Sequence, residues 1–152
     1  MTTELKKHLS NQLAEAQSKY IYFLLAVAAS AIALSVQRTT GQSLNWKMVP
    51  LGIAVICWAV SFFAGCRNRA YFSSTLYANA ALLQIQDGTH PDVPKYPDAV
   101  KAASEGVREA AENNSSMANF WGHLQFRFLV LGAICFLVWH IIEMMSVIPK
   151  TN

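Results

Sequence analysis

Three long stretches of this chain carry no charged side chain, and their lengths constrain its fold more than any other feature. Residues 20–37 and 48–66 contain no Asp, Glu, Lys or Arg, and residues 128–142 contain His140 but none of these four. A helix needs about 20 mostly apolar residues to cross the hydrocarbon layer of a membrane. The sequence therefore predicts three transmembrane helices, at residues 20–37, 48–66 and 128–148.

The composition excludes several other classes of protein. Only 14% of the 152 residues are charged and 53% are apolar, whereas about a quarter of a soluble domain is charged. The net charge of +3 comes without a basic stripe, so nothing points to nucleic-acid binding. We expect a small integral membrane protein, and neither a soluble enzyme, a disordered chain, a disulfide scaffold nor a nucleic-acid binder.

Residues 1–19 precede the first span and are polar. Leu5, Leu9, Leu13 and Ala16 recur there at helical spacing, with charged residues around them. This pattern predicts an amphipathic N-terminal helix rather than a signal peptide, which would place its apolar core directly behind a short basic start. Such a helix either contacts the membrane surface or packs on a neighbour, or it extends into solvent.

The first span carries one face of small side chains, formed by Ala26, Ala29, Ser30 and Ala33. Small residues allow another helix to approach closely within a membrane. Two interpretations are open: the stripe packs against the other spans of the same chain, or it forms a seam between subunits or lines a pore.

The second and third spans each continue into a long, more polar helix. Neither Gly nor Pro interrupts the chain between the second span and residue 86, so one helix is expected over residues 45–86, with Asn45 as its N-cap. Residues 87–97 contain three prolines and a glycine, which predicts a turn. Asp98 is a candidate N-cap for a last helix that runs to about residue 148.

A period of 3.5 residues runs through the polar part of this last helix. The predicted seam consists of Val100, Ala103, Val107, Ala110, Asn114, Met117, Trp121 and Leu124. A seam with this period pairs with a partner helix. We therefore expect residues 67–127 to form an antiparallel helical hairpin, so that the whole chain is an all-α membrane protein with three spans and a helical stalk.

Positive charge predicts the orientation in the membrane. Nine of the twelve Lys and Arg residues lie on the side that the N-terminus shares with the hairpin. Cytoplasmic segments of membrane proteins carry the excess of positive charge. The prediction is a multi-pass protein of the cell membrane, with the N-terminus and the stalk in the cytoplasm and the C-terminus outside.

The sequence contains no recognisable catalytic, metal-binding or cofactor-binding motif. The four histidines are scattered, and the three cysteines do not have the spacing of metal ligands. We therefore expect no enzymatic activity, no cofactor and no metal. His140 and Glu143 stand three residues apart near the outer end of the third span, on one helix face. They mark either a polar pathway, a proton-linked site or a clamp between helices, or simply the headgroup boundary, where Glu143 reaches water.

Two functions fit these features. The first is a non-enzymatic homo-oligomer whose spans surround a pore, a channel or a lipid-filled ring, with the stalk as the gating or sensing element. The second is an accessory or scaffold subunit of a larger membrane complex, whose stalk docks a cytoplasmic protein. The expected partners are the lipid bilayer, further copies of the chain and, in the second case, that soluble protein.

The layout of residues 13–86, two early spans followed by an extended amphipathic helix, resembles that of the two-span membrane effectors proposed to form pores in bacterial defence systems. The resemblance implies a pore-forming function for this chain and implies no residue roles. The third span distinguishes the chain from those effectors.

Overall fold

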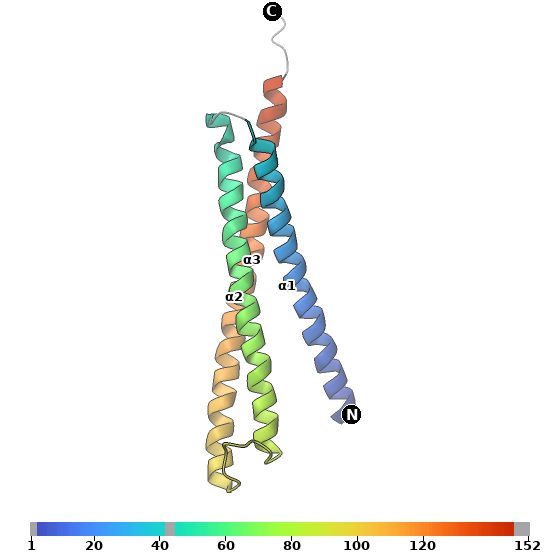
Figure 1. Ribbon diagram of the computed structural model, residues 1–152, viewed down its shortest axis with the longest axis vertical. Helices are drawn as coiled ribbons and strands as arrows, with labels where there is room; N and C mark the ends of the chain where they lie inside the picture. Colours follow the sequence, from blue (N-terminus) through green and yellow to red (C-terminus); the bar gives the residue numbers. More distant parts are fainter. Residues whose placement is uncertain (1–2, 42–44, 148–152) are drawn as a thin grey trace, which may run out of the picture. The chain divides into compact units, whose positions relative to one another are not determined.

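Three long α-helices make up the fold of this protein (Figure 1). The structure is a computed structural model that describes residues 3–41 and 45–147. Helix α1 spans Thr3–Thr39, α2 spans Val49–Gln86 and α3 spans Pro97–Val147, and a short 3-10 helix, η1 (Trp46–Met48), precedes α2. The predicted all-α fold is confirmed. Each of the three long helices is also long and apolar enough to cross a membrane.

The start of α3 differs from the predicted cap, whereas Asn45 occupies the N-cap position of η1. Helix α3 begins at Pro97, one residue before the predicted cap Asp98, and the Val100 amide donates to the Tyr96 carbonyl at 3.1 Å. Proline suits the first helical position because its missing N–H has no partner to find there and its φ is already helical. Asn45 is extended in front of η1, and its side chain forms no capping hydrogen bond.

Helix α2 ends in a Schellman motif around Gly88. The Gly88 amide donates to the Ile85 carbonyl at 3.1 Å, and the Thr89 amide donates to the Gln84 carbonyl at 2.9 Å. Gly88 has a φ of +66°, the left-handed conformation that this motif requires and that glycine adopts without a steric penalty. The glycine therefore ends α2 where the sequence predicts the turn.

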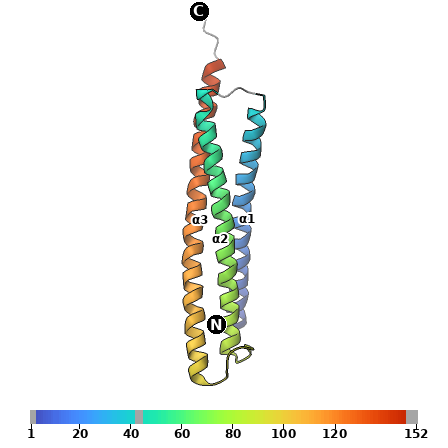
Figure 2. The ribbon, with the colours of Figure 1, turned by 60° about the vertical axis from the view of Figure 1, so that its left-hand side comes forward.

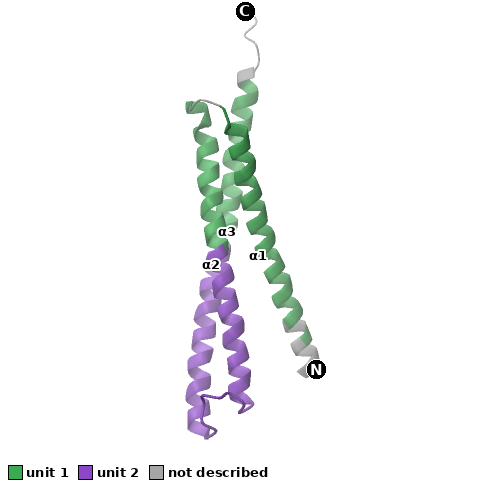
Figure 3. Ribbon diagram, in the orientation of Figure 1, with its two compact units in different colours: residues 1–65, 123–152 green, residues 66–122 purple. Residues whose placement is uncertain are grey.

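The chain divides into two compact units (Figure 3). Unit 1 comprises residues 1–65 and 123–152, and unit 2 comprises residues 66–122. Unit 2 is a helical hairpin in which the C-terminal part of α2 lies beside the N-terminal part of α3 in opposite direction (Figures 1 and 2). Unit 1 contains α1, the N-terminal part of α2 and the C-terminal part of α3.

Unit 1 is held together by glycines that receive larger side chains of a neighbouring helix. A Cβ on Gly132 of α3 would lie 2.6 Å from the indole nitrogen of Trp58 on α2, and that nitrogen donates to the Leu129 carbonyl at 3.3 Å. Gly65 of α2 is covered in the same way by Gln125 of α3 and Leu25 of α1. The helices therefore pack closely because no side chain separates them at these points.

The hairpin of unit 2 is closed by small and aromatic residues. Ala111 and Ala118 of α3 are buried, as are Phe72 and Ile85 of α2. Near the end of the unit, Gly122 lies against the amide of Asn68, 3.1 Å from where its Cβ would stand. Two alanines on the buried face of α3 thus let the partner helix come close, as it does in unit 1.

Replacing Gly132 by alanine tests the close contact in unit 1. The new Cβ would collide with the Trp58 indole, which is rigid, so the Gly132→Ala protein should lose about 1–3 kcal/mol of stability. The measurement is unfolding of the purified protein in mild detergent by titration with SDS. Gly52→Ala is the matched control, because nothing lies within 4 Å of its Cβ position. Equal stability of the two variants would contradict the packing described.

Candidate functional site

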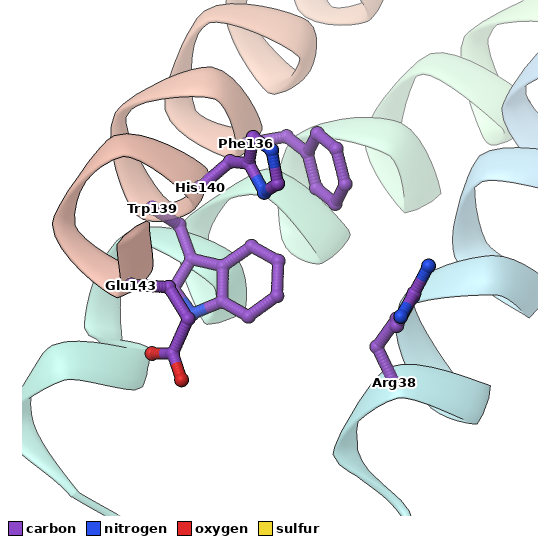
Figure 4. Close-up of a pocket in the computed structure, with 5 residues that line it drawn as sticks. All are labelled: Arg38, Phe136, Trp139, His140 and Glu143. Carbon is purple, nitrogen blue, oxygen red and sulfur yellow. The ribbon is translucent and has the colours of Figure 1, made fainter. Parts of the chain in front are cut away.

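An open pocket in unit 1 brings Arg38, which follows the first predicted span, together with His140 and Glu143 of the third. Its lining consists of Arg38 from α1 and Phe136, Trp139, His140 and Glu143 from α3, and its volume is about 470 Å³ (Figure 4). The two polar residues predicted from the third span, His140 and Glu143, thus lie in one pocket. Their proximity to Arg38 was not predicted from the sequence.

The wall on α3 is a cluster of stacked rings. The imidazole of His140 is parallel to the ring of Phe136, with 6.5 Å between their centroids. Trp139 is inclined to both rings and is almost entirely buried, whereas His140 is exposed. Trp58 of α2 stands behind Phe136, at 5.7 Å between centroids. The same indole that fills the Gly132 contact therefore also supports the pocket wall.

The opposite wall is the end of α1, where Arg38 lies in the last turn. A cation at a helix C-terminus is favoured by the partial negative charge of the unpaired carbonyl groups. Figure 4 shows Arg38 separated by open space from the rings and the carboxylate that project from α3. Within the part of the chain that the structure describes, the guanidinium forms no ion pair. It is therefore available to an anion that enters the pocket.

The pocket thus combines a cation, a carboxylate and aromatic faces around one space. A guanidinium binds phosphate or carboxylate through charge-assisted hydrogen bonds, so Arg38 is the group of this pocket that suits an anionic ligand. No group of three or more His, Cys, Asp and Glu residues that could hold a metal occurs in the described ranges.

The predicted small-residue stripe of the first span faces away from the core of unit 1. Ala26, Ala29, Ser30 and Ala33 are all exposed. The buried residues of α1 in this region are Ile21, Leu24, Ala28 and Ser35. The stripe therefore lies outside the buried face of α1 in unit 1.

The predicted seam of the stalk lies partly at the hairpin contact. The half-buried members are Val100, Ala103, Val107, Asn114, Trp121 and Leu124, whereas Ala110 and Met117 are exposed. The fully buried positions of α3 in unit 2 are Ala111 and Ala118, each one residue later. Trp121 contacts the Arg67 guanidinium of α2, which lies 5.8 Å from its ring centroid.

Buried polar side chains are the site feature that the sequence analysis missed. Gln125 is completely buried in unit 1, and neither its amide nitrogen nor its amide oxygen has a hydrogen-bond partner in the described ranges. Its backbone carbonyl accepts a 2.8 Å hydrogen bond from the buried Ser61 hydroxyl. One sequence pattern could have indicated its burial. Gln125, Gly132 and Trp139 follow one another at intervals of seven residues on α3, and all three are buried.

The cysteines remain separate from this site. Cys57, Cys66 and Cys135 are free thiols, of which Cys57 is buried and Cys66 is exposed. None of them lines the pocket.

Comparison of the chain with protein-family profiles, with curated proteins and with solved structures gives no match.

Replacing Gln125 by methionine tests whether its amide has a partner that a single copy of the chain does not provide. Methionine has a similar volume and no polar atoms, and an unsatisfied buried amide costs about 1–3 kcal/mol. The Gln125→Met protein should therefore be more stable than the wild type in SDS titration, by about 1 kcal/mol. Ser61→Ala, which removes a satisfied hydrogen bond, should be less stable. A destabilised Gln125→Met protein would contradict the prediction and indicate a partner on another molecule.

Proposed function

We propose that this protein is a non-enzymatic membrane protein with three crossings that assembles with further copies of itself around a pore or a lipid-filled ring. Its hairpin of residues 66–122 then stands in the cytoplasm as a gating or sensing element. The proposal is supported above all by the position of the small-residue stripe on α1, which is exposed along its whole length.

The sizes of the outward-facing side chains on α1 favour such an assembly. Lipid tails are as apolar as leucine, so small residues gain nothing from facing them and are favoured where two helices approach closely. In α1 small residues lie on two faces. Ala28 and Ser35 are buried inside unit 1, whereas Ala29 and Ala33 face outward, where the helices of unit 1 do not cover them. A second copy that packs on this face explains the distribution.

The outward surface of α1 is also divided into two flanks. With 100° between successive residues, the small stripe lies roughly opposite the buried face of the helix. The second exposed flank is formed by the larger residues Tyr20, Phe23, Val27 and Leu34. One flank therefore suits a neighbouring helix and the other suits lipid, as expected of a subunit in a closed ring.

The accessory-subunit function remains the second candidate, because the hairpin carries exposed apolar side chains. Those on its α2 part are Leu76, Tyr77 and Leu83, and those on its α3 part are Met117 and Phe120. In the cytoplasm, side chains of this size are covered either by the hairpins of other copies or by a soluble partner. The mass of the purified protein distinguishes the two functions.

The first test is the protein mass in mild detergent or nanodiscs, measured by light scattering corrected for bound detergent. We expect a discrete oligomer of high order for the wild type. The double variant Ala29→Leu/Ala33→Leu should dissociate it, because four-carbon side chains hold the neighbouring helices apart. The matched control is Ala59→Leu/Ala133→Leu, which changes two exposed alanines on α2 and α3 and should keep the wild-type mass.

A monomeric or dimeric wild type would overturn the proposed assembly and favour the accessory subunit. If the oligomer forms, release of a dye or of ions from liposomes separates a pore from a closed ring. The Ala29→Leu/Ala33→Leu protein should then lose the flux of the wild type, and the control variant should retain it.

The orientation is tested by cysteine labelling in whole cells, in a background in which the three natural cysteines are replaced by alanine. Asp92 lies in the turn of the hairpin and Lys47 in η1, and both are exposed. The proposed topology places Asp92 inside and Lys47 outside. An impermeant maleimide should therefore label Lys47→Cys and not Asp92→Cys until the cells are opened. The opposite pattern would reverse the topology.

A further inference from the structure

We propose that Arg67, Tyr71 and Trp121 form a binding site for the phosphate group of an anionic phospholipid, at the end of unit 2 that adjoins the second predicted span. Arg67 and Tyr71 belong to α2, and Trp121 belongs to α3. The ligand chemistry is a phosphate diester that carries one negative charge and no positive charge of its own. The inference rests on the membrane crossing in the proposed function, because that crossing brings these residues to the depth of the lipid headgroups.

Aromatic side chains hold the Arg67 guanidinium in place. Its carbon lies 5.1 Å from the ring centroid of Tyr71 and 5.8 Å from that of Trp121. One of its terminal nitrogens also donates a 2.9 Å hydrogen bond to the Tyr71 hydroxyl, one helical turn further along α2. Rings contact the face of a guanidinium, whereas its N–H groups point outward in its plane. Arg67 is therefore fixed by contacts that leave most of its donors for a ligand.

The donors of this cluster match the oxygens of a phosphate. Arg67 is exposed, and within the described ranges it forms no ion pair and donates one hydrogen bond, to Tyr71. A guanidinium has five N–H donors, and it can hold a phosphate through two parallel charge-assisted hydrogen bonds. The Tyr71 hydroxyl accepts the bond from Arg67 and keeps its own O–H as a donor. Both groups can therefore donate to phosphate oxygens.

The charge along both helices of the hairpin favours an anion at this place. Residues 66–86 of α2 contain two arginines, Arg67 and Arg69, and no Asp or Glu. Residues 113–122 of α3, which include Trp121, contain no charged side chain. A phosphate bound to Arg67 thus meets no carboxylate from the adjoining stretch of either helix. A headgroup that brings its own ammonium gains nothing from these residues, so the site favours an anionic lipid over a zwitterionic one.

The place of the cluster in the sequence points to a lipid as the source of the phosphate. Arg67 directly follows the second predicted span, residues 48–66. Tryptophan and tyrosine concentrate at the depth of the headgroups, and the cluster contains one of each. In the proposed topology this end of the span lies at the cytoplasmic leaflet, whose anionic lipids attract basic residues next to a span. The polar end of a lipid therefore comes within reach of Arg67.

The test is native mass spectrometry of the full-length protein in mild detergent with phosphatidylglycerol or phosphatidylcholine of identical acyl chains. We expect phosphatidylglycerol to bind at least about tenfold more tightly, because the phosphate of phosphatidylcholine is offset by the ammonium of the same headgroup. Equal binding of the two lipids, or a preference for phosphatidylcholine, would overturn the proposal.

Substitutions within the cluster separate a built site from a general attraction of basic residues to anionic lipid. Arg67→Gln should weaken the binding of phosphatidylglycerol by about tenfold or more. Arg67→Lys keeps the charge without the planar fork and should fall between the wild type and Arg67→Gln. Tyr71→Phe keeps the ring, removes the hydroxyl and should weaken binding by about threefold.

The matched control is Arg127→Gln, which removes the same charge on the same proposed side of the membrane. Arg127 is exposed and directly precedes the third predicted span, but it contacts no aromatic ring in the described ranges. This variant should keep most of the wild-type affinity for phosphatidylglycerol. Equal losses in Arg67→Gln and Arg127→Gln, or unchanged binding by Arg67→Gln, would overturn the site.

The source of the phosphate and the proposed assembly are read out separately. Saturable binding of inorganic phosphate with the affinity of the lipid would keep the phosphate chemistry and overturn its assignment to a lipid, whereas binding of phosphatidylglycerol alone assigns it to the bilayer. The same spectra give the number of subunits. A monomer that prefers phosphatidylglycerol contradicts the assembly only, and an oligomer without this preference contradicts the lipid site only. Extraction of cell membranes with alkaline carbonate checks the membrane crossing independently.

Discussion

The close contact between α2 and α3 at Trp58 and Gly132 is the interaction on which unit 1 depends. The glycine provides the space, the indole fills it, and the indole N–H donates to the Leu129 carbonyl one turn away. If the helices cross a membrane as proposed, apolar burial alone gives them little reason to associate, and tight contact and hydrogen bonding supply the stability. The same indole lies against Phe136, and it therefore links the helix pairing to the wall of the pocket.

This kind of contact also explains why polar residues occupy the inside of unit 1. Where glycine or alanine faces a partner helix, the space that remains admits a compact polar side chain such as Ser61, which finds a backbone carbonyl across the contact. Gln125 is placed by the same close approach against Gly65, but its amide lacks a partner among the described residues. A satisfied hydroxyl and an unsatisfied amide thus lie on neighbouring residues, and their energetic contributions have opposite sign.

The sequence predicted the elements of the fold well and the faces of the helices less well. Charge-free stretches and a proline-rich turn fix the number and the approximate ends of the helices. They leave open which of two adjacent residues is turned inward, because steps of three and four residues both return to one helix face. The predicted seam chose Ala110 and Met117, whereas Ala111 and Ala118 are the buried residues. At the second of these positions, a criterion based on apolarity favours the larger Met117, whereas close helix packing favours Ala118. Side-chain size does not distinguish Ala110 from Ala111.

Only part of the pocket could be predicted from the sequence. His140 and Glu143 were candidates because ionisable residues are rare within a span. Arg38 was not, because it lies at the end of a predicted span, where a positive charge is expected in any case. Tertiary packing brings Arg38 to His140 and Glu143. Because α1 and α3 belong to the same unit, the last turn of α1 lies across from the rings of α3. A positive charge at the end of a predicted span does not by itself require aromatic rings or a carboxylate opposite it. The position of Arg38 opposite a carboxylate and two aromatic faces gives it a chemistry that the charge alone does not imply.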